Sequence, residues 1–212
     1  MRETLCRLLT VTLQNSRTET VAKTTNSDVI KLQNCNLSFP ELFKARAFAE
    51  GQTPKYQAAF VFDPSDKSGA ANIKKVSAAI KQVLTQHYGE GKVPKGIKLC
   101  LKDNEKEEKA YDGYEGKWFL NSSNQTRPTV VNRDLTPIQE DDAILHPGCL
   151  VNASIILWVQ DNQYGKRVNA TLRAVQYVGK GEVWGGSAPV KAEQEFEPLE
   201  AADDDWDDEA PF

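Results

Sequence analysis

A repeated alternation of apolar and polar residues constrains the fold of this chain more than any other feature. It is clearest in LVNASIILWVQ at residues 150–160 and in RVNATLRAVQYV at residues 167–178, which a short polar turn joins. Period two places successive side chains on opposite faces of a β-strand. Shorter stretches of the same kind occur at 29–39, 55–63, 97–102, 117–123 and 129–132. The chain is therefore expected to form about seven short strands.

One segment has a different period. Residues 72–89 carry apolar side chains at spacings of three and four, at Ile73, Val76, Ile80, Val83 and Leu84. This spacing predicts an amphipathic helix, and Gly89 is a suitable end for it. Strands with a single inserted helix predict a mainly β domain, a small and mostly antiparallel barrel or sandwich.

The ends of the chain differ in composition from its middle. Residues 1–27 are polar and rich in Thr, without sustained periodicity, and we expect them to be a disordered leader. Residues 28–182 are expected to form one domain. Residues 183–212 are expected to be a flexible acidic tail, because they contain too few apolar groups to offset the entropy of ordering.

Charge is distributed unevenly along the chain. Between Glu193 and Phe212 there are ten acidic residues and no Lys or Arg, so the remainder holds 26 basic and 30 − 10 = 20 acidic residues. A basic body with an acidic tail indicates nucleic acid as a partner. The last thirteen residues, 200–212, also hold two rings, Trp206 and Phe212, that so charged a segment cannot bury, and we expect the tail to bind a partner protein. The residues expected to do so are Asp203, Asp204, Asp205, Trp206, Asp207, Asp208 and Phe212.

The outward faces of three strands carry the candidate binding residues. If the apolar face of each strand points into the core, the opposite faces present Trp158, Tyr177 with Arg167 and Arg173, and Phe119 with Lys117. Unpaired bases stack on such rings at ~1–3 kcal/mol each, while cations follow the phosphates. Neighbouring segments add Arg127, Arg133, Tyr111 and Tyr114. The alternative is that the rings form a second apolar layer or a dimer contact.

Signals of catalysis, cofactors and metals are weak. The four cysteines are widely spaced with no CxxC pair, and there are only two histidines, so no zinc site or disulfide framework is expected. Reduced thiols favour a cytosolic compartment. We find no phosphate-binding Gly loop, and no apolar run approaches the ~20 residues of a membrane span. One enzymatic alternative remains, a Mg²⁺ nuclease that uses the loop carboxylates Asp103, Glu105, Glu107 and Glu108 or the run Glu140, Asp141 and Asp142.

Taken in order, several motifs resemble a known family. NCNLSFPELF, KYQAAFVFD, GYEGKWFLNSS, RPTVVNRD and GCLVNASIILWVQDN, followed by the acidic tail, are similar to the single-stranded DNA-binding proteins encoded by bacteriophages. The similarity covers roughly residues 29–178 and the tail.

The resemblance implies an OB-fold barrel that binds single-stranded DNA without catalysis and with little sequence preference. It implies work in phage replication, recombination or repair, in the host bacterial cytoplasm, and a tail that contacts replication or recombination proteins. The alternative is an acidic-tailed interaction protein or nucleic-acid mimic without a DNA-coating role. The sequence leaves a homodimer open.

Overall fold

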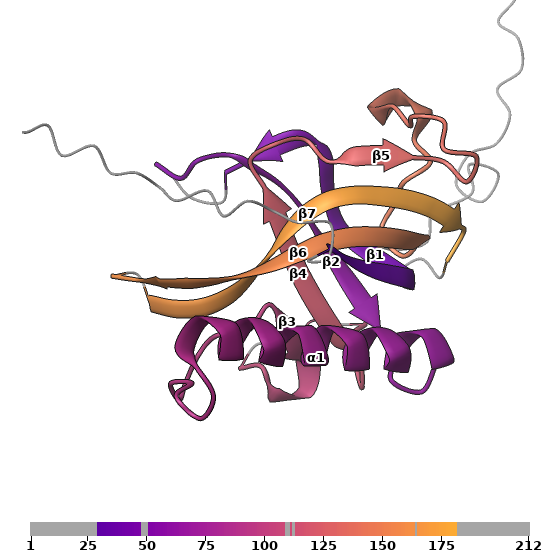
Figure 1. Ribbon diagram of the computed structural model, residues 1–212. Helices are drawn as coiled ribbons and strands as arrows, with labels where there is room; N and C mark the ends of the chain where they lie inside the picture. Colours follow the sequence, from indigo (N-terminus) through magenta and orange to yellow (C-terminus); the bar gives the residue numbers. More distant parts are fainter. Residues whose placement is uncertain (1–28, 48–50, 109–110, 112, 164, 182–212) are drawn as a thin grey trace, which may run out of the picture.

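The computed structural model describes residues 29–47, 51–108, 111, 113–163 and 165–181. The predicted leader, 1–27, and the whole of the predicted tail, 183–212, lie outside the described residues. The elements follow the chain in the order shown in Figure 1. They are β1 (Val29–Arg46), β2 (Lys55–Phe62), α1 (Lys67–Tyr88), β3 (Leu101–Asp103), η2 (Asn104–Lys106), β4 (Trp118–Asn124), β5 (Thr129–Val131), η3 (Glu140–Asp142), β6 (Leu150–Asn162) and β7 (Gly165–Gly179).

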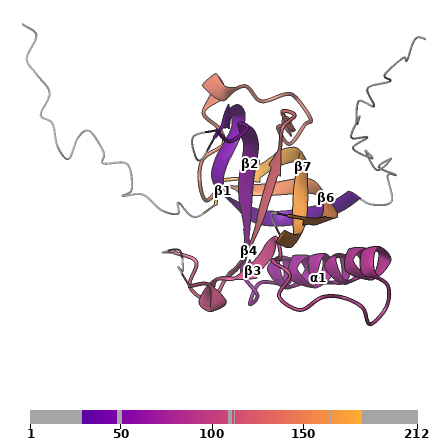
Figure 2. The same cartoon turned by 90° about the vertical axis from the view of Figure 1, so that its left-hand side faces the viewer.

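Five strands close into a barrel. β1 pairs with β6 and with β2, β2 pairs with β4, and β6 pairs with β7, all of them antiparallel. A parallel contact between β4 and β7, at Ser123 and Thr171, closes the ring. β3 extends the sheet beside β4, and β5 lies along β7 (Figures 1 and 2). The predicted mainly β barrel with one inserted helix is confirmed.

Strand β1 is longer and more bent than the sequence predicts. We expected it to end at Pro40, but it continues to Arg46, with shifts of register after Leu32 and after Ser38. Phe39 has a positive φ of 46° beside the second shift. Proline is tolerated where the ladder is already interrupted. The bends allow one strand to pair with β6 through its first half and with β2 through its second.

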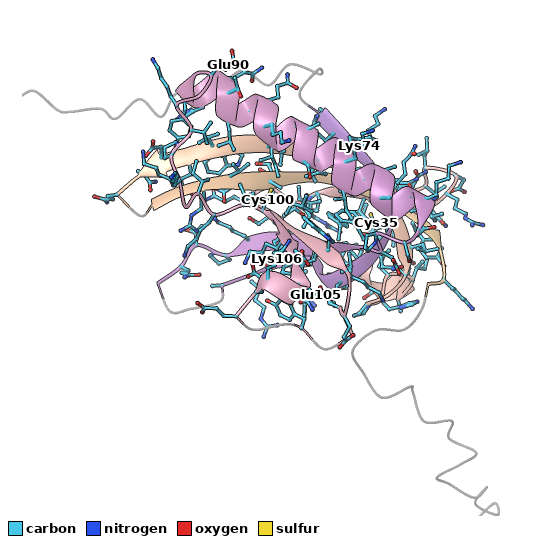
Figure 3. All side chains as sticks on the ribbon, turned by 90° about the horizontal axis from the view of Figure 1, so that it is seen from below. Cys35, Lys74, Glu90, Cys100, Glu105 and Lys106 are labelled. Carbon is cyan, nitrogen blue, oxygen red and sulfur yellow. The ribbon has the colours of Figure 1, made fainter. Side chains whose placement is uncertain are left out.

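The core fills the barrel and continues beneath α1. The predicted stripe on the helix is confirmed, since Val76, Ile80 and Leu84 are buried against the barrel. Figure 3 shows α1 lying across the strands. Asp66 begins the helix by accepting hydrogen bonds from the N–H groups of Ser68 and Gly69. The helix therefore covers one end of the barrel and leaves the outer faces of the strands for other contacts.

Candidate nucleic-acid interface

A groove of about 640 Å³ crosses the outer surface of the barrel. Strands β1, β2, β4 and the beginning of β7 contribute to it, together with the segment that leads into β3. Backbone hydrogen bonds hold that segment in place, because Lys98 N–H donates to Lys166 O at 3.2 Å and Val168 N–H donates to Lys98 O at 2.9 Å. The side chains that matter for binding are Phe39, Arg46, Gln57, Lys98, Lys102, Tyr111, Asn121, Arg167 and Asn169.

Two exposed aromatic rings stand at one wall of the groove. Phe39 is 54% exposed, Tyr111 is 45% exposed, and their ring centroids are 5.8 Å apart. Phe39 points outward although its neighbour of like parity, Leu37, is buried, because the positive φ at Phe39 turns the chain. The rings thus offer flat apolar surface beside the cationic and amide side chains of the groove.

Two buried rings support the exposed pair. Tyr114 is 3% exposed and Phe119 1%, and with Val61 they form a small cluster separate from the main core. Tyr111 meets the edge of Phe119 at a centroid distance of 5.5 Å and lies 5.4 Å from Tyr114. Burial raises the pKa of Tyr114 above its ordinary value. Because its supports are packed, the Tyr111 ring is already oriented before any ligand arrives.

A buried amide fixes the backbone of Tyr111. Asn104, in η2, accepts a hydrogen bond from Tyr111 N–H at 2.9 Å through its side-chain oxygen. Its side-chain NH₂ donates to Tyr111 O at 3.4 Å, and its own N–H donates to Lys117 O at 3.2 Å. Asn104 is therefore a positioning residue for the exposed ring.

Cations and amides line the rest of the groove. Arg46 forms an ion pair with Glu41 at 3.0 Å, and Lys102 pairs with Glu107 while its Nζ lies 5.9 Å from the centroid of the Phe119 ring. Asn169 donates to Gln160 Oε1 at 2.9 Å. Rings, cations and amides within one groove are the groups that bind bases and phosphates of an unpaired strand.

The structure brings only some of the predicted residues together. Tyr111 and Arg167 line the groove. Trp158 is 45% exposed, as expected, and lies directly opposite Asn169 on the β6–β7 ladder. Residues opposite each other in a ladder share a face of the sheet, so Trp158 extends the groove along the hairpin.

The expected exposure of Phe119 and Tyr177 is wrong. Phe119 does face away from the main core, but the loop that carries Tyr111 and Tyr114 covers it. Tyr177 packs against the core instead of facing outward. The β6–β7 register passes from Ser154–Ala174 to Ile155–Leu172 and leaves Arg173 without a residue opposite it. This bulge reverses the parity of the residues from Ala174 to Tyr177, up to the next shift of register.

Four predicted cations lie outside the groove. Arg173 lines a second pocket with Lys31. The Arg127 guanidinium lies 5.4 Å from the centroid of the Phe43 ring, and Arg133 donates to Val178 O near the end of β7. Lys117 is half-buried and directly precedes β4.

Seven of the nine side chains named for the groove are absent from the residues that the sequence predicts. They are Phe39, Arg46, Gln57, Lys98, Lys102, Asn121 and Asn169. The one usable signal was the pair Phe39–Pro40, because a proline inside an apolar run marks a bulge or edge where a ring can turn outward. Nothing local distinguishes the lysines from other surface lysines.

The structure gives little support to the nuclease alternative. Glu107 pairs with Lys102, Asp103 with Lys106 at 2.7 Å, and Glu140 with Lys44 at 2.8 Å. Glu105 and Lys106 lie in η2 (Figure 3). Among the described residues, no three His, Cys, Asp or Glu side chains converge in a way that could hold a metal ion.

The three thiols among the described residues are also poorly suited to nucleophilic chemistry. Burial raises the pKa of Cys35 and Cys149, and raises that of Cys100 to about 11. They are therefore protonated near neutral pH.

In the part of the chain that the structure describes, no helix is long and apolar enough to cross a membrane.

A closed five-stranded barrel with an aromatic and cationic groove across its strands defines an OB-fold protein of the nucleic-acid-binding class. The chain belongs to the family of the ssDNA-binding protein of Enterobacter phage Enc34, whose sequence model matches residues 28–208. The resemblance to phage single-stranded DNA-binding proteins is thereby confirmed.

Two individual phage proteins are also similar to this chain. Protein p50 of Acyrthosiphon pisum secondary endosymbiont phage 1 is 34% identical over 184 residues, which cover 83% of this chain and 96% of p50. The single-stranded DNA-binding protein from bacteriophage Enc34, solved in complex with ssDNA, is 29% identical with a TM-score of 0.66, over 76% of this chain and 91% of that one.

A more distant structure shares the fold. The single-stranded DNA-binding protein gp2.5 of bacteriophage T7 has a TM-score of 0.50 at 13% identity, over 80% of this chain and 94% of that one.

Proposed function

We propose that this protein is a non-catalytic single-stranded DNA-binding protein that coats and protects unpaired DNA. The observation that carries the proposal is the exposed pair Phe39 and Tyr111, supported by buried rings at the wall of a cationic groove. Membership of the phage family supports it independently.

The chemistry of the groove favours an unpaired strand over a duplex. In a duplex the faces of the bases are stacked on each other, whereas an unpaired base can stack on Phe39 or Tyr111. Arg46, Lys98 and Arg167 contact the phosphates and release condensed counterions. Because the protein binds only the open form, it melts weak hairpins by mass action.

The predicted residues take different parts in this function. Tyr111, Arg167 and Trp158 contact DNA directly, whereas Tyr114 and Phe119 act by holding Tyr111 in place. Arg127, Arg133 and Lys117 add to the positive field around the barrel. Tyr177 belongs to the core.

We further propose that residues 28–182 are the DNA-binding domain and that the acidic tail recruits replication, recombination or repair proteins. Asp203–Asp205, Trp206, Asp207, Asp208 and Phe212 are the proposed contact residues, and all of them lie outside the described residues. An apolar ring flanked by acids suits a partner with a basic rim around an apolar pocket.

The binding proposal is tested by titrating labelled oligothymidylate and a duplex of the same length with the full chain, at several salt concentrations. We expect tight binding to the single strand, much weaker binding to the duplex, and affinity that falls as salt rises. A preference for duplex would contradict the proposal. If the chain fails to bind single strands yet its tail captures a partner, the alternative of an interaction protein holds instead.

A second incubation tests the nuclease alternative. End-labelled single strands are incubated with the protein and Mg²⁺, and with a variant in which Glu105, Glu107 and Glu108 are replaced by glutamine. We expect intact DNA in both samples. Cleavage that requires both Mg²⁺ and the three carboxylates would establish an enzyme.

A further inference from the structure

A second pocket, of about 470 Å³, lies on the outer surface of β1, β5, β6 and β7. Lys31, Thr129, Ser154 and Arg173 line it, together with Val29 and Ala174. The backbone beneath it is continuous, because Lys31 pairs with Ser154, Ser154 with Ala174, and Ala174 with Thr129. The pocket therefore rests on four adjacent strands and is not the gap beside a single loop.

The groups around this pocket suit an oxyanion. Lys31 and Arg173 supply two cations, and the hydroxyls of Thr129 and Ser154 are further donors. None of the described carboxylates forms an ion pair with Lys31 or Arg173. A third cation is near, since Lys75 Nζ donates to Lys31 O at 2.9 Å. Phosphate oxygens would satisfy these donors without displacing an existing ion pair.

The β7 bulge lies at this pocket, and both Arg173 and Ala174 line it. Because the register skips Arg173, its side chain is exposed and has no neighbour directly opposite it on β6. Arg173 shares its strand parity with Arg167 and Asn169, which line the groove. Six residues of strand, about 20 Å, separate Arg173 from Arg167, so this cation lies at the pocket and not in the groove.

Trp158 lies between the groove and the pocket. It is opposite Asn169, a residue of the groove, and it stands four residues from Ser154 on β6. Four residues of a strand span about 13 Å, and side chains at even spacing share a face. The half-buried Ile156 lies between them on that same face. The outer surface of β6 therefore connects the two sites through one exposed ring.

We propose that the pocket of Lys31 and Arg173 binds backbone phosphate of a DNA strand that leaves the groove over Trp158. This inference rests on the proposed function of the groove. It makes binding depend on length in two stages: a short oligonucleotide fills the groove alone, and a longer one also reaches the pocket.

The test uses the full chain with oligothymidylates from about four to about twenty nucleotides, a span that brackets OB-fold site sizes. The variant is Lys31→Gln with Arg173→Gln. Its charge-matched control is Lys67→Gln with Lys81→Gln, two exposed lysines of α1 that line neither site. Circular dichroism checks that each variant is folded.

We expect the pocket variant to bind the shortest oligonucleotides like the control, and the longest ones about tenfold more weakly. For the long ones its slope of log K against log salt should become shallower by about 0.7 for each phosphate that the variant no longer neutralises. Trp158→Ala should likewise weaken the binding of long oligonucleotides more than that of short ones.

Two results would overturn the inference. In the first, the pocket variant matches the control at every oligonucleotide length. In the second, it binds more weakly by the same factor at every length, which would indicate only a general electrostatic attraction of DNA to the protein. In both cases wild-type binding to single strands persists, so the proposed function would stand. Failure of the wild type to bind any oligonucleotide would instead remove both proposals.

Discussion

The rings of Phe39 and Tyr111 are exposed, whereas the rings beneath them are buried. Truncating an exposed ring should therefore affect DNA binding, and truncating a buried ring should affect the stability of the fold. Phe39→Ala and Tyr111→Ala should each weaken single-strand binding by ~1–3 kcal/mol, since each removes a stacking surface. The free energy of unfolding should remain near that of the wild type, because neither ring is buried. Fluorescence anisotropy and urea denaturation measure the two quantities.

Phe119→Ala provides the contrast. This ring is buried under the tyrosines, so its removal should lower the free energy of unfolding by about 3–5 kcal/mol. If Phe39→Ala destabilised the fold as strongly as Phe119→Ala does, Phe39 would be a core residue and the wall of the groove would need another ring.

The first turn of α1 depends on a glycine. A Cβ built on Gly69 would lie 1.9 Å from Asp63 O, which belongs to the backbone. Gly69→Ala should therefore destabilise the protein, although alanine is favoured in helices by about 1 kcal/mol. Ala78→Gly is the control, because at this exposed position of α1 the substitution changes only the helix propensity. Urea denaturation should show a larger decrease in stability for Gly69→Ala than for Ala78→Gly. A stabilised Gly69→Ala would mean that the Asp63 loop moves freely.

The tip of the β6–β7 hairpin is attached to the end of α1 by a polar contact. Tyr88 donates to Asp161 at 3.0 Å, and Lys166 pairs with the same carboxylate at 2.8 Å. The hydrogen bond from Lys166, and then that from Tyr88, lower the pKa of Asp161 below its ordinary value of 3.8.

This attachment should weaken in acid. A lowered pKa in the folded state adds stability that is present above pH 3.8 and is lost as pH falls through the lower, folded value. Stability measured against pH should therefore decrease more steeply at the acid end for the wild type than for Asp161→Asn. Identical acid limbs in both proteins would show that Asp161 makes no net contribution.

Charge is the property that belongs to the molecule as a whole. The 26 basic and 30 acidic residues leave a net charge of −4, yet ten of the acids lie in the last twenty residues. Deleting Asp203–Phe212 should tighten DNA binding at low salt, because a covalently attached polyanion competes with phosphate. It should also abolish recruitment of replication proteins.

A control variant with a tail of the same length but less negative charge distinguishes the effect of the tail's charge from the effect of its presence. In this control the five aspartates of the last ten residues are replaced by asparagine. The control should bind DNA as tightly as the deletion does. Unchanged affinity at low salt in both variants would contradict competition by the tail.

Local patterns predicted the elements well and the outward faces less well. The stripe of α1 depends on spacing within a single helix, so Val76, Ile80 and Leu84 were placed correctly. Trp158 was also placed correctly, because β6 alternates without interruption. Tyr177 was misplaced by one unpaired residue, since such a residue reverses the parity of those that follow it up to the next shift of register.

The sequence alone determined the mainly β class, the helix, the separation of charge and the resemblance to a phage family, because period, composition and motif order are properties of a chain read in one dimension. The tertiary structure decided which rings are exposed and which cations share a site. Phe39 turns outward at a backbone bend and meets Tyr111 from a distant segment, and Phe119 is covered by the loop that directly precedes β4. Exposure and proximity depend on contacts between distant segments, and only the closed barrel determines those.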